Sequence, residues 1–242
     1  MFKFCWVIAV NFFRLPFIIR KMRKMALPSK GYTQEERYSY AQHIVKLMRT
    51  TGWIVTKGYG EENLPQEGGY IMYPNHQGKY DVYGIISTHA NPCTVVMDKA
   101  KSYIIFVKEA LELLDGKRLD KGDLRQSLTI INEVAEEVKN GARFILFPEG
   151  GYEDNKNTLQ EFKPGCFKIA IKSRMPIIPV ALIDSYKVFN SRSIGRVETQ
   201  VHYLEPIYYE EYCGMKTPQI ADMVKKRIED KIQEVEARSV LV

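Results

Sequence analysis

Short apolar runs alternate with longer helical patterns over most of this chain, and that alternation limits the possible folds more than any other feature. Each run suits one strand, and the segment after it has apolar residues at helical spacing. Strands separated by helices form a mostly parallel sheet, because each helix returns the chain to the same end of the sheet. We therefore expect α/β architecture, a single domain with a mostly parallel central sheet flanked by helices. The expected strands are 70–73, 94–97, 143–147, 177–183 and 197–203, and the expected helices are 82–89, 101–114, 124–140, 165–173 and 218–236.

A further helix is expected before the first of these strands. Thr33 and Glu36 have the spacing of a capping box, in which each side chain accepts a hydrogen bond from the backbone amide of the other residue. Gly52 is a natural end for this helix. Apolar positions between these points recur at helical spacing, so the helix should pack on the domain or on the N-terminal segment.

The positive charge of the chain is concentrated near its N-terminus. The 242 residues have a formal net charge of +6, and the first acidic residue is Glu35. Because the early charges lie in an apolar, aromatic-rich segment, they favour an anionic membrane surface as a partner. No zinc-finger or helix-turn-helix spacing is present, so nucleic acid is not an expected partner. The basic residues before Glu35 are Lys3, Arg14, Arg20, Lys21, Arg23, Lys24 and Lys30.

We expect residues 1–30 to form a basic, apolar, membrane-anchoring helix. Its apolar stretch from Phe4 to Ile19 would be about 24 Å long, shorter than the roughly 30 Å hydrocarbon core of a bilayer. On a helical wheel its polar side chains form one narrow stripe, which favours a helix lying in the membrane interface. A short membrane-spanning helix, and a core helix or signal sequence, are the alternatives. The stripe consists of Lys3, Asn11, Arg14 and Lys21.

The four cysteines, Cys5, Cys93, Cys166 and Cys213, lie far apart in the sequence. No CxxC pair occurs, so neither a zinc site nor a disulfide framework is expected. Isolated thiols fit a reducing compartment. Together with the basic N-terminal segment, they predict peripheral attachment to the cytoplasmic face of the cell membrane, with a single span as the alternative.

The segment Asn-His-Gln-Gly-Lys-Tyr-Asp at 75–81 leaves an expected strand and enters an expected helix. Imidazole can remove a proton from a hydroxyl near neutral pH, and a carboxylate on its other nitrogen would fix its tautomer. In a straight helix His76 and Asp81 would point about 140° apart. They can meet only if the chain turns between them, and Gly78 would ease such a turn.

Two further segments place charged groups in loops. The strand expected at 143–147 leads into Pro-Glu-Gly-Gly, so Glu149 and Gly150 either shape a binding pocket or form an ordinary turn. Arg118 and Lys121 lie in a polar loop between two helical patterns. They could bind a phosphate group, and a solvated charged loop is the alternative.

The order of four segments resembles a known enzyme family. Asn-His-x4-Asp, Leu-Asp-Lys, Phe-Pro-Glu-Gly and Pro-Ile-Ile-Pro-Val follow one another here as four sequence blocks do in the 1-acylglycerol-3-phosphate acyltransferase family. Four blocks in the same order are far more specific than any one of them. The resemblance extends over residues 69–205, so residues 31–242 are the expected acyltransferase domain.

The resemblance implies a catalytic pair, with His76 as general base and Asp81 as its partner. Two positions depart from the family pattern. Lys121 replaces the usual arginine of the second block. It retains the positive charge but cannot form the bidentate hydrogen bonds of a guanidinium group. Tyr152 stands where the third block has a phosphate-binding arginine. The implied substrate-binding residues are Asn75, Arg118, Lys121, Glu149, Gly150 and Lys163, of which Arg118 and Lys163 are candidates to supply the missing charge.

The implied reaction moves a fatty acyl group from acyl-coenzyme A or acyl-carrier protein to the free sn-2 hydroxyl of 1-acylglycerol 3-phosphate, giving phosphatidic acid for phospholipid synthesis. Neither a metal nor another cofactor is implied. Glycerol 3-phosphate and other lysolipids are alternative acceptors, and a non-catalytic lipid-binding protein is a less favoured alternative. A lipid sensor has no need of a general base, and a lipid hydrolase is disfavoured because the chain has no G-x-S-x-G motif.

Overall fold

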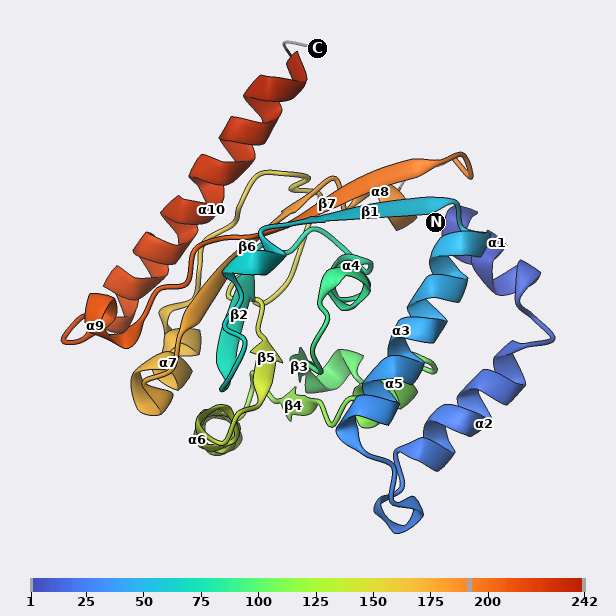
Figure 1. Ribbon diagram of the computed structural model, residues 1–242, viewed down its shortest axis with the longest axis horizontal. Helices are drawn as coiled ribbons and strands as arrows, with labels where there is room; N and C mark the ends of the chain where they lie inside the picture. The colour runs from blue at the N-terminus through green and yellow to red at the C-terminus, as the bar shows by residue number, and fades with distance from the viewer. Residues whose placement is uncertain (1, 191–192, 241–242) are drawn as a thin grey trace.

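The computed structural model describes residues 2–190 and 193–240, which form one α/β domain around a seven-stranded sheet (Figure 1). The strand order is β1-β7-β6-β2-β5-β3-β4. Neighbouring strands are parallel except for β6 and β7, so the expected fold class is confirmed. The strands are β1 (Ile54–Tyr59), β2 (Tyr70–Pro74), β3 (Thr94–Asp98), β4 (Lys117–Leu119), β5 (Arg143–Ile145), β6 (Ile177–Ile183) and β7 (Val197–Tyr203).

Helices cover both faces of the sheet (Figure 1). Strand β2 shows why both faces are apolar: Ile71 and Tyr73 pack into one core cluster, and Tyr70 and Met72 pack into the other. One face carries α3 (Gln34–Thr51), α4 (Asp81–Thr88) and α5 (Val107–Leu113), and the other carries α6 (Leu124–Lys139), α7 (Lys168–Ser173) and α10 (Thr217–Val240). Short helices α8 (Lys187–Asn190) and α9 (Tyr209–Tyr212) and 3₁₀ turns at Pro28–Lys30, Glu61–Asn63, Lys99–Lys101 and Pro164–Phe167 complete these elements.

Two strands were not expected from the sequence. Strand β1 lies at the edge of the sheet and contains Lys57 and Gly58. An edge strand is partly open to solvent, so it need not be apolar throughout. Strand β4 is three residues long and lies at the other edge of the sheet, paired with β3. Arg118 therefore lies on a strand, opposite Met97, and its expected place in a polar loop was wrong.

Helix α3 confirms the predicted capping box. The Thr33 amide donates to Glu36 Oε2 at 2.8 Å, and the Glu36 amide donates to Thr33 Oγ1 at 3.2 Å. The helix expected at 101–114 is shorter than predicted. A 3₁₀ turn ends at Lys101 and α5 begins only at Val107, because Phe106 has a φ of +75° that a helix cannot contain.

The N-terminal segment forms two helices rather than one. Helices α1 (Phe2–Val10) and α2 (Leu15–Met25) meet at an angle of 87°. Asn11 ends the first helix: its Nδ2 donates to Val7 O at 2.9 Å and to Thr51 Oγ1 at 3.0 Å. Pro16 lies in the first turn of the second helix, where its missing amide hydrogen costs nothing. The expected continuous helix was therefore wrong, and the division of the chain at residue 30 stays a prediction.

Lys3 does not belong to a lipid-facing polar stripe. Its side chain is fully buried, and Nζ donates to Gly52 O at 3.1 Å and to Gly195 O. Burial lowers the pKa of this ammonium group. Two of the four expected stripe residues, Lys3 and Asn11, thus attach α1 to the domain, which the helical wheel of a single straight helix could not reveal.

Exposed aromatic side chains lie in the turn between α1 and α2 and at the start of α2. Phe12, Phe13 and Phe17 have exposed fractions of 62%, 84% and 75%. Among the described residues, no single helix is long and apolar enough to cross a membrane, whereas α1 and α2 taken together have the required length and composition.

Candidate active site

His76 and Asp81 meet in the loop that joins β2 to α4. His76 Nδ1 lies 2.6 Å from Asp81 Oδ2, so the predicted turn between the two residues is confirmed. The turn does not depend on glycine, however. Gly78 has no positive φ, and a Cβ at this position would meet no heavy atom closer than 3.7 Å.

Four donors surround the Asp81 carboxylate, which is fully buried in the first turn of α4. Besides the imidazole, Oδ2 accepts from the amides of Gln77 at 2.6 Å and Gly78 at 2.9 Å. Oδ1 accepts from Ser185 Oγ at 2.5 Å. An ionised carboxylate only accepts, so the proton of a neutral His76 lies on Nδ1 and the lone pair lies on Nε2. Nε2 is therefore the nitrogen that can act as a base.

Ser185 was not predicted from the sequence. It follows β6, more than a hundred residues after Asp81, and is 3% exposed. Gln77 holds it in place, because Gln77 Oε1 accepts from the Ser185 amide at 2.8 Å while Nε2 donates to Leu182 O at 2.8 Å. Ser185 reaches the His76–Asp81 dyad because β2 and β6 are neighbours in the sheet. That strand order cannot be predicted from the sequence.

Asn75 and Glu149 brace the backbone on either side of His76. Asn75 is fully buried and bonds to Leu182 in both directions, with Nδ2···O at 3.0 Å and N···Oδ1 at 2.7 Å. Glu149 Oε1 accepts from the His76 amide at 2.9 Å, and burial raises the pKa of Glu149. Both side chains fix the position of His76, and their expected contacts with substrate stay predictions.

Two aromatic rings enclose the imidazole. The Phe147 ring stacks on His76 with centroids 4.1 Å apart, and the Tyr152 ring meets it edge-on at 4.6 Å. Lys101 Nζ lies 5.7 Å from the centroid of Tyr152. Burial, followed by the negative charge of Asp81, raises the pKa of Tyr152, so this residue presents a neutral phenol beside the base.

Two of the three expected phosphate ligands lie beside Gly150. Lys121 Nζ donates to Gly150 O at 2.5 Å and pairs with Asp98 at 2.7 Å. A Cβ added at Gly150, whose φ is +71°, would lie 3.0 Å from Lys163 Nζ. Arg118 is directed elsewhere, to Glu112 at 3.2 Å. A pocket of about 420 Å³ adjoins this cluster and is lined by Asp98, Lys99, Ala100, Tyr103, Asp120, Lys121 and Gly122.

His89 is buried on the face of the sheet that α3, α4 and α5 cover, and it has a structural role. Its Nδ1 lies 2.7 Å from Asn91 O, and its Nε2 lies 2.6 Å from Tyr70 Oη. A carbonyl only accepts, so Nδ1 donates and Nε2 accepts from Tyr70. Burial lowers the pKa of His89 to about 4, which keeps the ring neutral.

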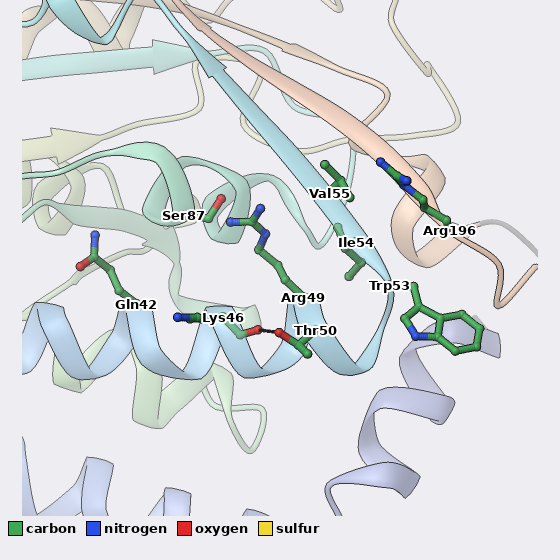
Figure 2. A pocket seen from close by; sticks show the side chains of 9 residues that line it. All are labelled: Gln42, Lys46, Arg49, Thr50, Trp53, Ile54, Val55, Ser87 and Arg196. Carbon is green, nitrogen blue, oxygen red and sulfur yellow. Dashed lines mark hydrogen bonds between the residues drawn. The ribbon is translucent and has the colours of Figure 1, made fainter.

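A groove of about 740 Å³ lies between α3, β1 and α4, away from the dyad (Figure 2). None of the residues expected in the active site lines it, and its lining has three cations and no acid. The lining residues are Gln42, Lys46, Arg49, Thr50, Trp53, Ile54, Val55, Ser87 and Arg196.

The chain is similar to proteins of known family. Residues 55–183 match the model of the family described as Acyltransferase. A 1-acyl-sn-glycerol-3-phosphate acyltransferase of Saccharomyces cerevisiae is 29% identical over 80% of this chain, and one of Salmonella typhimurium is 26% identical over 70%. The chain spans 64% of the yeast relative and 69% of the bacterial one.

A similar fold occurs in a crystal structure from Thermotoga maritima. That structure, the 1-acyl-sn-glycerophosphate acyltransferase PlsC, has a TM-score of 0.73 and 22% sequence identity. The alignment covers 95% of this chain and 92% of the other. The correspondence therefore includes nearly the whole fold, beyond the part that the family model matches.

Proposed function

The chain belongs to the acyltransferase family, and we propose that it transfers a fatty acyl group from an acyl thioester to the sn-2 hydroxyl of 1-acylglycerol 3-phosphate, giving phosphatidic acid. The observation on which this proposal rests is the 2.6 Å contact between His76 and Asp81 at the end of β2. The names of the yeast and bacterial relatives, both 1-acyl-sn-glycerol-3-phosphate acyltransferases, support the choice of acceptor.

The proposed reaction begins with proton removal by His76. Nε2 takes the proton of the acceptor hydroxyl as its oxygen attacks the thioester carbonyl. Asp81 stabilises the imidazolium that forms, through the hydrogen bond to Nδ1. The tetrahedral intermediate then expels the thiolate of coenzyme A or carrier protein, which takes the proton from His76. No metal or other cofactor takes part in this proposed step.

The acceptor phosphate is proposed to bind beside Gly150. Lys121 and Lys163 provide two ammonium groups there, and Lys101 Nζ lies 5.7 Å from the centroid of the Tyr152 ring. Lys121 already contacts Asp98 and a carbonyl, so a phosphate would exchange one of these contacts for a stronger charge-assisted one. Tyr152 contributes no positive charge, which favours another lysolipid as the second candidate acceptor.

The proposed site of action is the cytoplasmic surface of the cell membrane. The exposed rings of Phe12, Phe13 and Phe17 would lie in the bilayer interface, and the basic side chains of α2 would contact lipid phosphates. This arrangement places a lipid acceptor and its lipid product in the same layer as the enzyme.

A panel of acceptors and donors tests the proposal. The purified protein is incubated with vesicles that contain lysophosphatidate or lysophosphatidylcholine, or with glycerol 3-phosphate, and with acyl-coenzyme A or acyl-carrier protein. Product lipids are identified by mass. Phosphatidic acid as the main product supports the proposal, while acylation of lysophosphatidylcholine alone would move it to the second candidate.

A further inference from the structure

Three consecutive apolar side chains project from the loop that follows the 3₁₀ turn at Lys99–Lys101. Tyr103, Ile104 and Ile105 have exposed fractions of 58%, 61% and 68%. Single exposed apolar residues are common on protein surfaces, but three in succession, two of them β-branched aliphatics, are not expected to face water without a reason.

The loop is held in this conformation from its Tyr103 side. The Arg118 guanidinium carbon lies 5.3 Å from the centroid of the Tyr103 ring. The same guanidinium donates to Ser102 Oγ at 3.1 Å and to Glu112 at 3.2 Å. Arg118 therefore fixes the start of the loop, and this contact gives it a function distinct from the phosphate binding that the sequence suggested.

The other end of the loop is fixed by a strained residue and a buried carboxylate. Phe106 has φ +75° and ψ −45°, a conformation that is costly for a residue with a side chain. Glu109, which is 1% exposed, accepts from the Phe106 amide at 2.7 Å through Oε2. Its Oε1 accepts from Arg23 Nε at 3.0 Å and Nη2 at 2.6 Å. Glu109 thus stabilises the strained conformation of Phe106, and its ion pair with Arg23 also joins α2 to α5.

These contacts connect the loop to both the N-terminal helices and the active site. Helices α1, α2, α3 and α5 gather on one side of the molecule (Figure 1). On the other side of the loop, Tyr103 lines the pocket that contains Lys121, and Lys101 contacts Tyr152, which packs on His76. The loop therefore lies between α2, which Arg23 joins to Glu109, and the pocket beside the His76–Asp81 pair.

We propose that the Tyr103–Ile105 loop is a second membrane contact, which inserts into the bilayer at the mouth of the pocket that contains Lys121, so that a lipid acceptor reaches His76 directly from the membrane. The proposal rests on the proposed function. Lys99 is paired with Asp120 at 3.1 Å, but Lys101 and Lys108 are exposed on either side of the apolar tip, and their charges complement an anionic lipid surface. A stable contact with another protein needs about 800 Å² per partner, more than three side chains provide, whereas insertion of a loop needs no such area.

The first experiment measures the surroundings of the loop. Ile104→Cys is introduced into the full chain together with Cys5→Ser and Cys213→Ser, and the thiol is labelled with an environment-sensitive fluorophore. Ile171→Cys, on α7 at the opposite face of the sheet, is the matched control. With vesicles of phosphatidylcholine and phosphatidylglycerol, the label at 104 should shift to shorter wavelength and be quenched by nitroxide lipids, and the label at 171 should not.

The outcomes separate this inference from the proposed reaction. A label at 104 that stays in water while the protein sediments with vesicles would overturn the loop contact and leave helices α1 and α2 as the anchor. Failure of the protein to bind vesicles would overturn it as well. Neither result depends on acyl transfer, which is measured on its own.

A second experiment tests the functional consequence. The double variant Ile104→Asn/Ile105→Asn should weaken vesicle binding about tenfold or more, because two aliphatic side chains no longer gain from burial in hydrocarbon. Its transfer to vesicle-borne lysophosphatidate should fall, and its transfer to a short-chain, water-soluble acceptor should stay unchanged. Equal losses with both acceptors would contradict the proposal, since the defect would then lie in the site itself.

Discussion

Replacing Ser185 by alanine should lower kcat while leaving the fold intact. Ser185 Oγ donates to Asp81 Oδ1 at 2.5 Å inside a fully buried environment. A hydrogen bond to a charged group contributes about 1.5–3 kcal/mol, and each 1.4 kcal/mol corresponds to roughly a factor of ten. If that stabilisation is needed to keep the carboxylate aligned with His76, Ser185→Ala should reduce kcat about tenfold to a hundredfold, with donor and acceptor KM little changed.

The control is a serine with similar burial and no link to the dyad. Ser173 is 3% exposed, as Ser185 is, and its Oγ donates to Ala170 O within its own helix. Steady-state transfer and urea unfolding are measured for both alanine variants. The Asp81→Asn background adds a stricter test, because a residue that acts through Asp81 should cause little further loss there.

Two results would refute this reasoning. The first is a Ser185→Ala protein whose kcat is no lower than that of Ser173→Ala. The second is a full, additive loss of kcat when Ser185→Ala is combined with Asp81→Asn. In either case Ser185 would stabilise the sheet without positioning the catalytic carboxylate.

Three further predictions concern the acceptor, the pH dependence of stability and the membrane. Lys121→Ala should raise the acceptor KM roughly tenfold to a hundredfold and leave the donor KM unchanged, measured at saturating donor; no change would remove this lysine from the phosphate site. Burial lowers the pKa of His89 from 6.5 to about 4, so between these values the unfolded chain binds more protons and the free energy of unfolding should fall as the pH falls. Urea unfolding across this range should show that His89→Gln removes a pH-dependent loss of roughly 3 kcal/mol, and an unchanged slope would exclude His89 as its source. Arg20→Gln and Lys24→Gln should each weaken sedimentation with anionic vesicles roughly fivefold at low salt, and an equal effect at high salt would contradict an electrostatic origin.

The sequence predicted what depends on local order. His76 and Asp81 are five residues apart, so one turn of the chain brings them together, and the segment itself contains the whole dyad. The strands of the sheet centre were also predictable, because a strand buried on both faces, such as β2, is apolar at every position.

The sequence could not predict what depends on strand order. Ser185 and Leu182 reach the dyad only because β6 lies next to β2. Strand β1 was not predicted, because an edge strand can contain charged residues such as Lys57 and then lacks a continuous apolar pattern. The fate of Lys3 was hidden for a related reason: its charge is accommodated by carbonyl groups at residues 52 and 195, far away in sequence.

The most direct test of the central claim is transfer by the His76→Ala protein. Purified wild-type and variant chains are compared with acyl-coenzyme A and lysophosphatidate in vesicles, after thermal unfolding has shown that both are folded. We expect the variant to lose at least about 10²-fold in kcat, the lower end of the contribution of a general base. A folded His76→Ala protein that forms phosphatidic acid at a near wild-type rate would contradict the account.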